Sequence, residues 1–403
     1  MTQCCQSRYF RLWLLATATG MALVALFNVV IDPAGAFSAV HLKSLEPFRP
    51  RAENRLMKAE LAHRPGWDIV LLGSSRVLGG LPADYPLFVT NRTVNLALPA
   101  AYLPELRSAL RTVLDDNGRA PRLVILGLDF HMFLGGADHL ADFPGTRFNS
   151  RYDRLDYYAK RLLALSTTED SLAVLSNYAR GEANGSQDRF GFITHRTRSD
   201  FAHRPVFDQS MRALAVTYRL MPYWPSNRID VLRDIIRDCR ERNIDLRLIL
   251  MPVHALDLEL LDAAGHGENF DDLRRALVRL LASEGLEGTV PLLDATGYSG
   301  PPTEEIPPSS VRGPSMRYFI ENSHATPALG AMVLNRLFGA GSNQFGDFLT
   351  STNIESHLAR FHQDRAQYRR EHPADCQWPR AILESLGGAI SPRGATNLPW
   401  LPN

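Results

Sequence analysis

The first pattern along the chain is an apolar run near the N-terminus. Residues 12–31 include no charged side chain, Arg8 and Arg11 precede them, and Asp32 follows them. A helix of about 20 residues spans the roughly 30 Å hydrocarbon core of a bilayer. The alternative is a cleaved signal peptide, whose apolar region is usually only about 7–15 residues long. We therefore expect a transmembrane anchor that leaves residues 1–11 in the cytoplasm and the main domain in the periplasm or another extracytoplasmic space.

Beyond the anchor, short apolar runs alternate with amphipathic segments. The apolar runs have the length and β-branching of buried strands and cover residues 69–72, 93–97, 123–128, 246–251 and 290–293. Apolar residues at helical spacing predict intervening helices over residues 104–114, 229–242 and 270–283. This alternation predicts an α/β fold with a parallel sheet covered on both faces. Five such strands with right-handed crossovers predict a flavodoxin-like, three-layer sandwich.

The segments outside this rhythm set the predicted domain limits. The expected parts are a connector, the α/β domain and a C-terminal helical appendage, over residues 32–50, 51–340 and 341–403. The α/β domain is interrupted by a long insertion, residues 130–227. Its two candidate helices, near 153–165 and 170–179, are too short to be stable alone. We expect the insertion to form a helical cap over the rim of the sheet.

Composition and charge narrow the function classes. The chain has 44 basic and 43 acidic residues, so no overall field favours a nucleic acid partner. There is no Cys-x-x-Cys and no histidine cluster with zinc spacing, so we expect neither a metal nor a cofactor. Cys239 and Cys376 lie outside the predicted anchor, and the sequence leaves open whether they pair.

The first candidate for chemistry is a serine at the end of a strand. Residues 69–72 are followed by Gly73, Ser74, Ser75 and Arg76, where a central parallel strand delivers side chains to the edge of the sheet. A serine there becomes a nucleophile if a base reaches its hydroxyl and a third group orients that base. The alternative is a serine pair that caps a helix.

The matching candidate acid and base lie near the other end of the domain. Glu321 and His324 are three positions apart, just before an expected helix that Thr326 can cap and that has Pro327 in its first turn. On such a loop the carboxylate can accept the imidazole Nδ1 proton and leave Nε2 free for a serine. The alternative is a surface histidine beside a helix cap.

Together these motifs resemble the SGNH (GDSL-type) hydrolase superfamily. Within it, the chain is most similar to the membrane-anchored branch that includes alginate O-acetylation and teichoic-acid D-alanylation proteins. The resemblance covers roughly residues 68–338. Residues 94–100 resemble the second conserved block, with Ala100 where the family usually has glycine, and residues 126–129 resemble the third, with Asp129 where many members have asparagine.

The resemblance implies roles for the site residues. Ser75 takes the place of the family's serine nucleophile, His324 that of the base and Glu321 that of the usual aspartate. The main-chain N–H groups of Ser75 and Ala100 are the implied oxyanion donors. Asp129 then either holds the loops by accepting hydrogen bonds or is protonated, because a carboxylate would repel an oxyanion.

Two further residues are candidates for substrate binding. Arg76 either anchors the turn after the first strand or meets a substrate carboxylate. His254 follows a predicted strand, so it either contacts substrate or has a structural role. Residues 189–204 in the insertion mix arginine, histidine and phenylalanine; they either bind an anionic polysaccharide or form a solvated loop.

The family resemblance implies a serine esterase or O-acyltransferase that acts on a cell-envelope or exported polysaccharide. Its expected partners are that polysaccharide, or another acylated envelope substrate, and a multi-pass membrane protein that supplies the acyl group. The alternatives are a polysaccharide-binding or assembly protein that has lost the chemistry, and an anchored scaffold whose Gly-Ser-Ser turn binds an anion through backbone amides.

Overall fold

The structure is a computed structural model that describes residues 2–37, 42–49, 54–116, 118–134, 137–183, 187–193, 201–220, 227–341 and 345–386. Two compact units share the chain. The helical unit combines Met1–Leu61 with Ala141–Arg196, and the sheet unit combines Ala62–Leu140 with Thr197–Asn403. Each unit is therefore built from two separate stretches of sequence.

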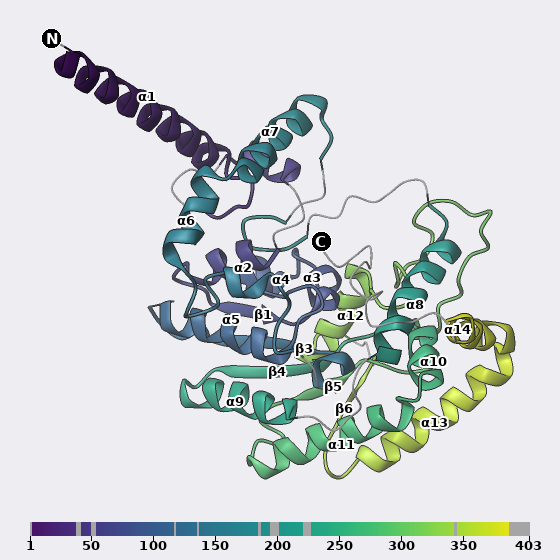
Figure 1. Ribbon diagram of the computed structural model, residues 1–403. Coiled ribbons are helices and arrows are strands. Elements are labelled where there is room, and N and C mark those ends of the chain that lie inside the picture. Colours follow the sequence, from purple (N-terminus) through teal and green to yellow (C-terminus); the bar gives the residue numbers. More distant parts are fainter. Residues whose placement is uncertain are drawn as a thin grey trace. The chain divides into compact units, whose positions relative to one another are not determined.

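The sheet unit is α/β, and its six-stranded sheet is mostly parallel (Figure 1). In spatial order the strands are β2 (Thr93–Asn95), β1 (Ile69–Leu72), β3 (Leu123–Leu128), β4 (Asp245–Leu250), β5 (Leu292–Asp294) and β6 (Asp347–Phe348). Every residue of β1, β2 and β3 is buried. Strands β1 and β3 are accordingly apolar on both faces, whereas β2 combines Val94 with the buried polar residues Thr93 and Asn95. The first five strands are parallel, as the sequence predicts.

The predicted all-parallel sheet needs one correction, because β6 pairs with β5 in the antiparallel direction. Residues 341–403, expected to be an appendage, supply this strand. They also supply α13 (Ile354–Glu371), which packs against α11, and α14 (Pro373–Ser385), which packs against α8 and α10. The described part of the C-terminal segment is therefore integral to the sheet unit.

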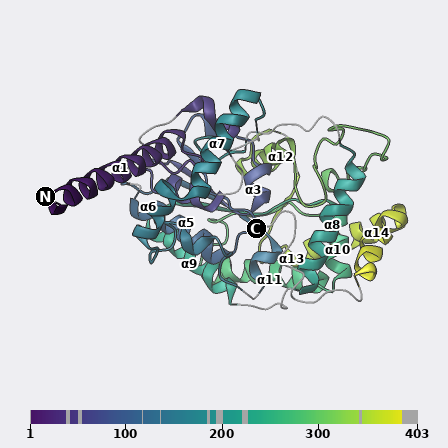
Figure 2. The same cartoon turned by 45° about the horizontal axis from the view of Figure 1, so that its top comes forward.

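Helices cover the sheet on both faces. Figures 1 and 2 show α3 and α12 on one face and α9 and α11 on the other. The main helices of the unit, apart from the two above, are α3 (Ser75–Gly80), α4 (Pro86–Val89), α5 (Leu103–Asp116), α8 (His203–Leu220), α9 (Arg228–Glu241), α10 (Ala255–Ala263), α11 (Gly267–Ser283) and α12 (Pro327–Phe338). Cys239 in α9 and Cys376 in α14 are buried free thiols. The pairing left open by the sequence is absent.

The helical unit contains the N-terminal helix. Its elements are α1 (Thr2–Ile31), η1 (Lys43–Phe48), α2 (Asn54–Ala62), η3 (Phe143–Gly145), α6 (Arg154–Leu163) and α7 (Leu165–Arg180). Within α1, the stretch Arg8–Ile31 is long and apolar enough to cross a membrane.

The predicted insertion is divided between the two units. Residues 141–196, with α6 and α7, belong with α1, whereas α8 packs on α10 in the sheet unit. The two short helices expected near 153–165 and 170–179 are present as α6 and α7. Both helices pack on α1 and on each other, and α7 also packs on η1, all within the helical unit.

Candidate active site

The turn after β1 places Ser75 at the edge of the sheet. Gly73 has a φ of +151°, a backbone conformation that favours glycine, and a Cβ atom at this position would lie 2.4 Å from Val77 Cγ2. Ser74 then caps α3, because its Oγ accepts a hydrogen bond from the Arg76 N–H at 3.1 Å. The capping role thus belongs to Ser74, and Ser75 is the first residue of the helix.

The structure brings Ser75 together with the two residues expected to activate it. Ser75 Oγ lies 2.8 Å from His324 Nε2, and His324 Nδ1 is hydrogen-bonded to Glu321 Oε1. The His324 side chain keeps 38% of its surface exposed, whereas Glu321 keeps 8%. The arrangement is a serine, a base that a substrate can reach, and a shielded carboxylate that orients the base.

Two serines that the sequence did not single out hold Glu321. Ser210, on α8, donates a hydrogen bond to Glu321 Oε2, and Ser323 donates one to Oε1 at 3.1 Å. The Ser323 N–H also donates to Oε2 at 2.9 Å. Ser323 follows Glu321 closely in sequence, but only the packing of α8 could identify Ser210.

These contacts set the charges of the acid and the base. Burial disfavours the carboxylate of Glu321, but His324 and the hydrogen bonds from Ser210 and Ser323 outweigh it and lower the Glu321 pKa to about 2. Desolvation opposes protonation of His324, yet the charge of Glu321 outweighs it and raises the His324 pKa above its ordinary 6.5. The pair therefore favours an imidazolium as the proton leaves serine, as general-base chemistry requires.

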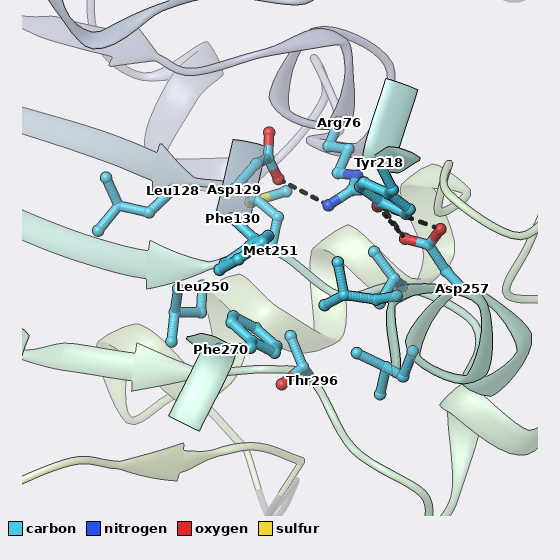
Figure 3. Close-up of a pocket in the computed structure, with 13 residues that line it drawn as sticks. Arg76, Leu128, Asp129, Phe130, Tyr218, Leu250, Met251, Asp257, Phe270 and Thr296 are labelled. Atoms are coloured by element: carbon cyan, nitrogen blue, oxygen red, sulfur yellow. Dashed lines mark hydrogen bonds and ion pairs between the residues drawn. The ribbon is translucent and has the colours of Figure 1, made fainter. Parts of the chain in front are cut away.

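A buried ion-pair network links Arg76 to Asp129 and Asp257 (Figure 3). The guanidinium of Arg76 donates to Asp129 Oδ1 at 3.1 Å and to Asp257 Oδ2 at 2.9 Å. Asp257 Oδ1 also accepts from Asn322 Nδ2 at 3.1 Å. Arg76 adjoins Ser75 and Asn322 adjoins Glu321, so Asp257 fixes both sides of the site. Burial raises the Asp257 pKa to about 6, although Arg76 opposes the shift.

This network also decides between the alternatives for Arg76. Its side chain is only 11% exposed and has two carboxylate partners, so it anchors the turn. A pocket lies beside the network and continues into an apolar lining that includes Phe130, Met251 and Phe270 (Figure 3). Of the charged side chains that line the pocket, Arg76 forms ion pairs with both Asp129 and Asp257.

Asp129 and Ala100 lie near the turn, as the resemblance implies. The Leu98 N–H donates to Gly73 O at 2.9 Å, which ties the segment after β2 to the start of the turn. Ala100 has a φ of +49°, a conformation that glycine adopts without strain. Asp129 forms an ion pair with Arg76, which favours its expected role in holding the loops.

His254 does not have the geometry expected of a substrate contact. Its ring is buried between Phe207 and Phe319, its Nδ1 accepts from the Leu256 N–H at 3.2 Å, and its Nε2 donates to Glu304 O at 2.8 Å. Burial lowers its pKa to about 4. Of the two alternatives that the sequence left open, the structure favours the structural role: His254 caps α10.

Other expected features fall partly outside the described residues. Residues 194–200, the centre of the basic and aromatic segment, lie outside them, so its proposed role in polysaccharide binding stays a prediction. Within the part of the chain that the structure describes, no group of three or more histidine, cysteine or acidic side chains could hold a metal ion.

No family model matches the chain, and no curated protein matches it significantly. The chemistry of the site is therefore inferred from its own geometry.

Proposed function

We propose that this protein is a membrane-anchored, extracytoplasmic serine esterase or O-acyltransferase of the SGNH (GDSL-type) class. The observation that carries the proposal is the unbroken series of contacts from Ser75 through His324 to Glu321. The strand order β2-β1-β3-β4-β5 supports a flavodoxin-like sandwich, in which ligands bind beyond the carboxyl ends of the strands at the β1/β3 switch point. Ser75 follows β1 and Asp129 follows β3.

The reaction has two acyl-transfer steps. Ser75 Oγ attacks the carbonyl carbon of an ester while His324 Nε2 takes the hydroxyl proton, and Glu321 stabilises the resulting imidazolium. The main-chain N–H groups of Ser75 and Ala100 stabilise the oxyanion. When the carbon–oxygen bond of the leaving alcohol breaks, His324 returns the proton to that alcohol and an acyl-serine remains.

The second step decides between the two activities. Water in the place of the alcohol gives an esterase, and a sugar hydroxyl gives an O-acyltransferase; in both cases His324 accepts the proton of the attacking group. A cell-envelope or exported polysaccharide is the proposed acceptor or substrate, and a multi-pass membrane protein is the proposed source of the acyl group. This placement rests on α1 as an anchor and on the resemblance to the envelope-modifying branch of the superfamily.

The direct test is covalent labelling by a fluorophosphonate, which reacts with activated serines. We expect the wild-type protein to be labelled, Ser75→Ala to lose the label and Ser108→Ala, a helical serine of α5, to keep it. His324→Ala should also lose it, and the Ser75→Ala/His324→Ala double variant should be no worse than either single variant, because the residues act as a unit.

Ala100 and Asp129, which depart from the family pattern, favour one alternative, a binding or assembly protein without catalysis. That alternative predicts no labelling of the wild-type protein and full biological function of a folded Ser75→Ala variant in cells. Either result would replace the enzyme proposal.

A further inference from the structure

An unusual apolar surface covers the corner between α6 and α7 in the helical unit. It is made of large side chains that remain exposed although they lie on packed helices: Leu155, Tyr158, Leu163, Leu165 and Leu172. Leu155 is 81% exposed and Leu165 is 73% exposed. We call these five residues the corner surface. Exposed apolar patches of this kind mark sites that meet a partner or a membrane.

The interior of the same corner includes a polar contact between α1, α6 and α7, beside an apolar cluster that contains Ile31 and Val174. Asn28 of α1 is fully buried, and its Nδ2 donates to Leu162 O and to Thr168 Oγ1, both at 3.0 Å. Ser171 Oγ donates to Asn28 Oδ1 at 2.9 Å. Small polar residues of α7 thus face α1, whereas Leu165 and Leu172 of the same helix are exposed. This is the pattern of helices whose outer surroundings are apolar.

The hydrogen bonds of Asn28 also fix where the corner lies. They place the α6–α7 junction at the last turn of α1, where Figure 1 shows the three helices meeting. Leu23 and Leu26, in the preceding turn of α1, are 62% and 60% exposed. Exposed apolar side chains of α1 therefore continue to about the level of the α6–α7 junction, at the end of that helix opposite to Arg8 and Arg11.

The charges of α6 suit the surface of a bilayer. Three basic residues and one acidic residue lie in this helix: Arg154, Lys160, Arg161 and Asp156. Leu155, Tyr158 and Leu162 form its apolar stripe at spacings of three and four residues. An amphipathic helix with leucine and tyrosine on one face and an excess of basic residues lies in the interface between headgroups and acyl chains.

We infer that the corner surface is embedded in the outer leaflet of the bilayer that α1 spans, so that α6 and α7 form a second, interfacial membrane contact. The inference rests on the proposed membrane placement of α1. Asn28, which would be unfavourable in lipid, is shielded by α6 and α7 at the depth where α1 leaves the membrane.

The test measures depth directly in the full-length protein. Single fluorescent amino acids are introduced at Leu165 and at Leu15 of α1, which are 73% and 65% exposed. The variants are reconstituted into vesicles of phosphatidylcholine and phosphatidylglycerol, with or without bromine on the acyl chains. We expect bromine to quench both probes. A probe at Leu172 repeats the test if the protein with a probe at Leu165 does not fold.

The outcomes separate the two proposals. Quenching at Leu15 but not at Leu165 or Leu172 overturns the corner contact and leaves the anchor intact; a protein partner would then be the better occupant of the surface. No quenching at any position overturns the anchor as well.

Discussion

At the residue scale, local sequence motifs predict much of the site, whereas the remaining contacts depend on tertiary packing. Gly73–Ser75 follows an apolar strand, and Glu321 and His324 share one loop, so each half of the triad has a signal within a few positions. No such signal identifies Ser210 or Asp257, because their contacts depend on how α8 and α10 pack. The role of His254 stayed open in the sequence because the end of a strand does not reveal that the ring turns inward, between Phe207 and Phe319.

The pH dependence of the reaction should report the Glu321–His324 contact. His324 accepts a proton only when it is neutral, and its pKa lies above 6.5, so kcat/KM should rise with pH through a midpoint above 6.5 and then level off. Glu321→Gln removes the charge that raises this pKa, so the rise should move to lower pH and the plateau should fall, roughly 10³-fold or more.

Ser210→Ala is the matched control for this profile. It removes one hydrogen bond to Glu321 but keeps the charge, so the midpoint should stay above 6.5 and the plateau should fall much less. An unchanged midpoint in Glu321→Gln would mean that His324 is not the group that titrates.

The strained backbone of Ala100 gives a prediction about stability. Glycine adopts a φ of +49° without strain, so Ala100→Gly should relieve backbone strain in the folded state. Glycine also increases the conformational entropy of the unfolded chain, which offsets part of this gain, so the free energy of unfolding should rise by up to about 1 kcal/mol. Activity should be retained, since the proposed oxyanion donor is the main-chain N–H. Chemical denaturation measures the first effect and ester hydrolysis the second.

Asn243→Gly is the control, because Asn243 has a similar φ of +54° but lies in the turn before β4. Asparagine tolerates this conformation better than alanine, so the gain should be smaller. A more stable Ala100→Gly protein with lost activity would mean that the methyl group itself is needed.

At the element scale, the hydrophobic pattern predicted the long elements and failed on the shortest. Strands β1 and β3 are apolar throughout and the amphipathic helices α9 and α11 are long, so their signals are strong. Strand β6 has two residues, one of them Asp347, and no apolar run precedes it. Two residues are too few to show a periodicity, so the sequence does not reveal their antiparallel pairing with β5.

Close packing of α3 on α12 aligns the nucleophile with the base, and it should be sensitive to a single methyl group. A Cβ atom at Gly330 would lie 1.8 Å from Gly80 O, so Gly330→Ala must push the helices apart. We expect a loss of about 1–3 kcal/mol of stability. The rate of fluorophosphonate labelling should also fall, because α3 begins at Ser75 and α12 follows His324.

Gly79→Ala provides the comparison on the same helix. A Cβ atom there would meet nothing within 4 Å, so this variant should melt at or slightly above the wild-type temperature and label normally. Equal behaviour of the two variants would show that the α3–α12 contact does not control the site.

At the scale of the whole molecule, the sequence predicts most helices and strands but not which of them belong to the same compact unit. The chain leaves the helical unit after Leu61, builds β1 to β3, and returns to the helical unit from Ala141 to Arg196. Hydropathy marks α6 and α7 as short amphipathic helices, but it does not identify the surface that covers them. The buried Asn28 of α1 forms hydrogen bonds with both helices. A single asparagine in an apolar run does not reveal from the sequence which residues it will bond.

The anchor proposal predicts a defined topology. Because Arg8 and Arg11 oppose translocation, a reporter enzyme fused after Asn403 should be active only outside the cytoplasm, and the full-length protein should stay in membranes after a high-salt wash. Replacing both arginines with glutamate is the matched variant and should weaken this orientation. Release of a soluble protein that lacks roughly the first thirty residues would contradict the anchor, since a signal peptide is removed in the mature protein.

The separation of Ser75 and His324 in the sequence means that the ribosome makes them at different times. The two residues are 249 positions apart, and Ser210 lies between them. At roughly 5–20 residues per second, synthesis of that interval takes roughly 10–50 s. Throughout it Ser75 is an ordinary alcohol, because neither its base nor the carboxylate that orients the base exists yet. The proposed mechanism therefore predicts that a chain ending before His324 is chemically silent, and that reactivity begins only after His324 has been made and its side chain has reached Ser75.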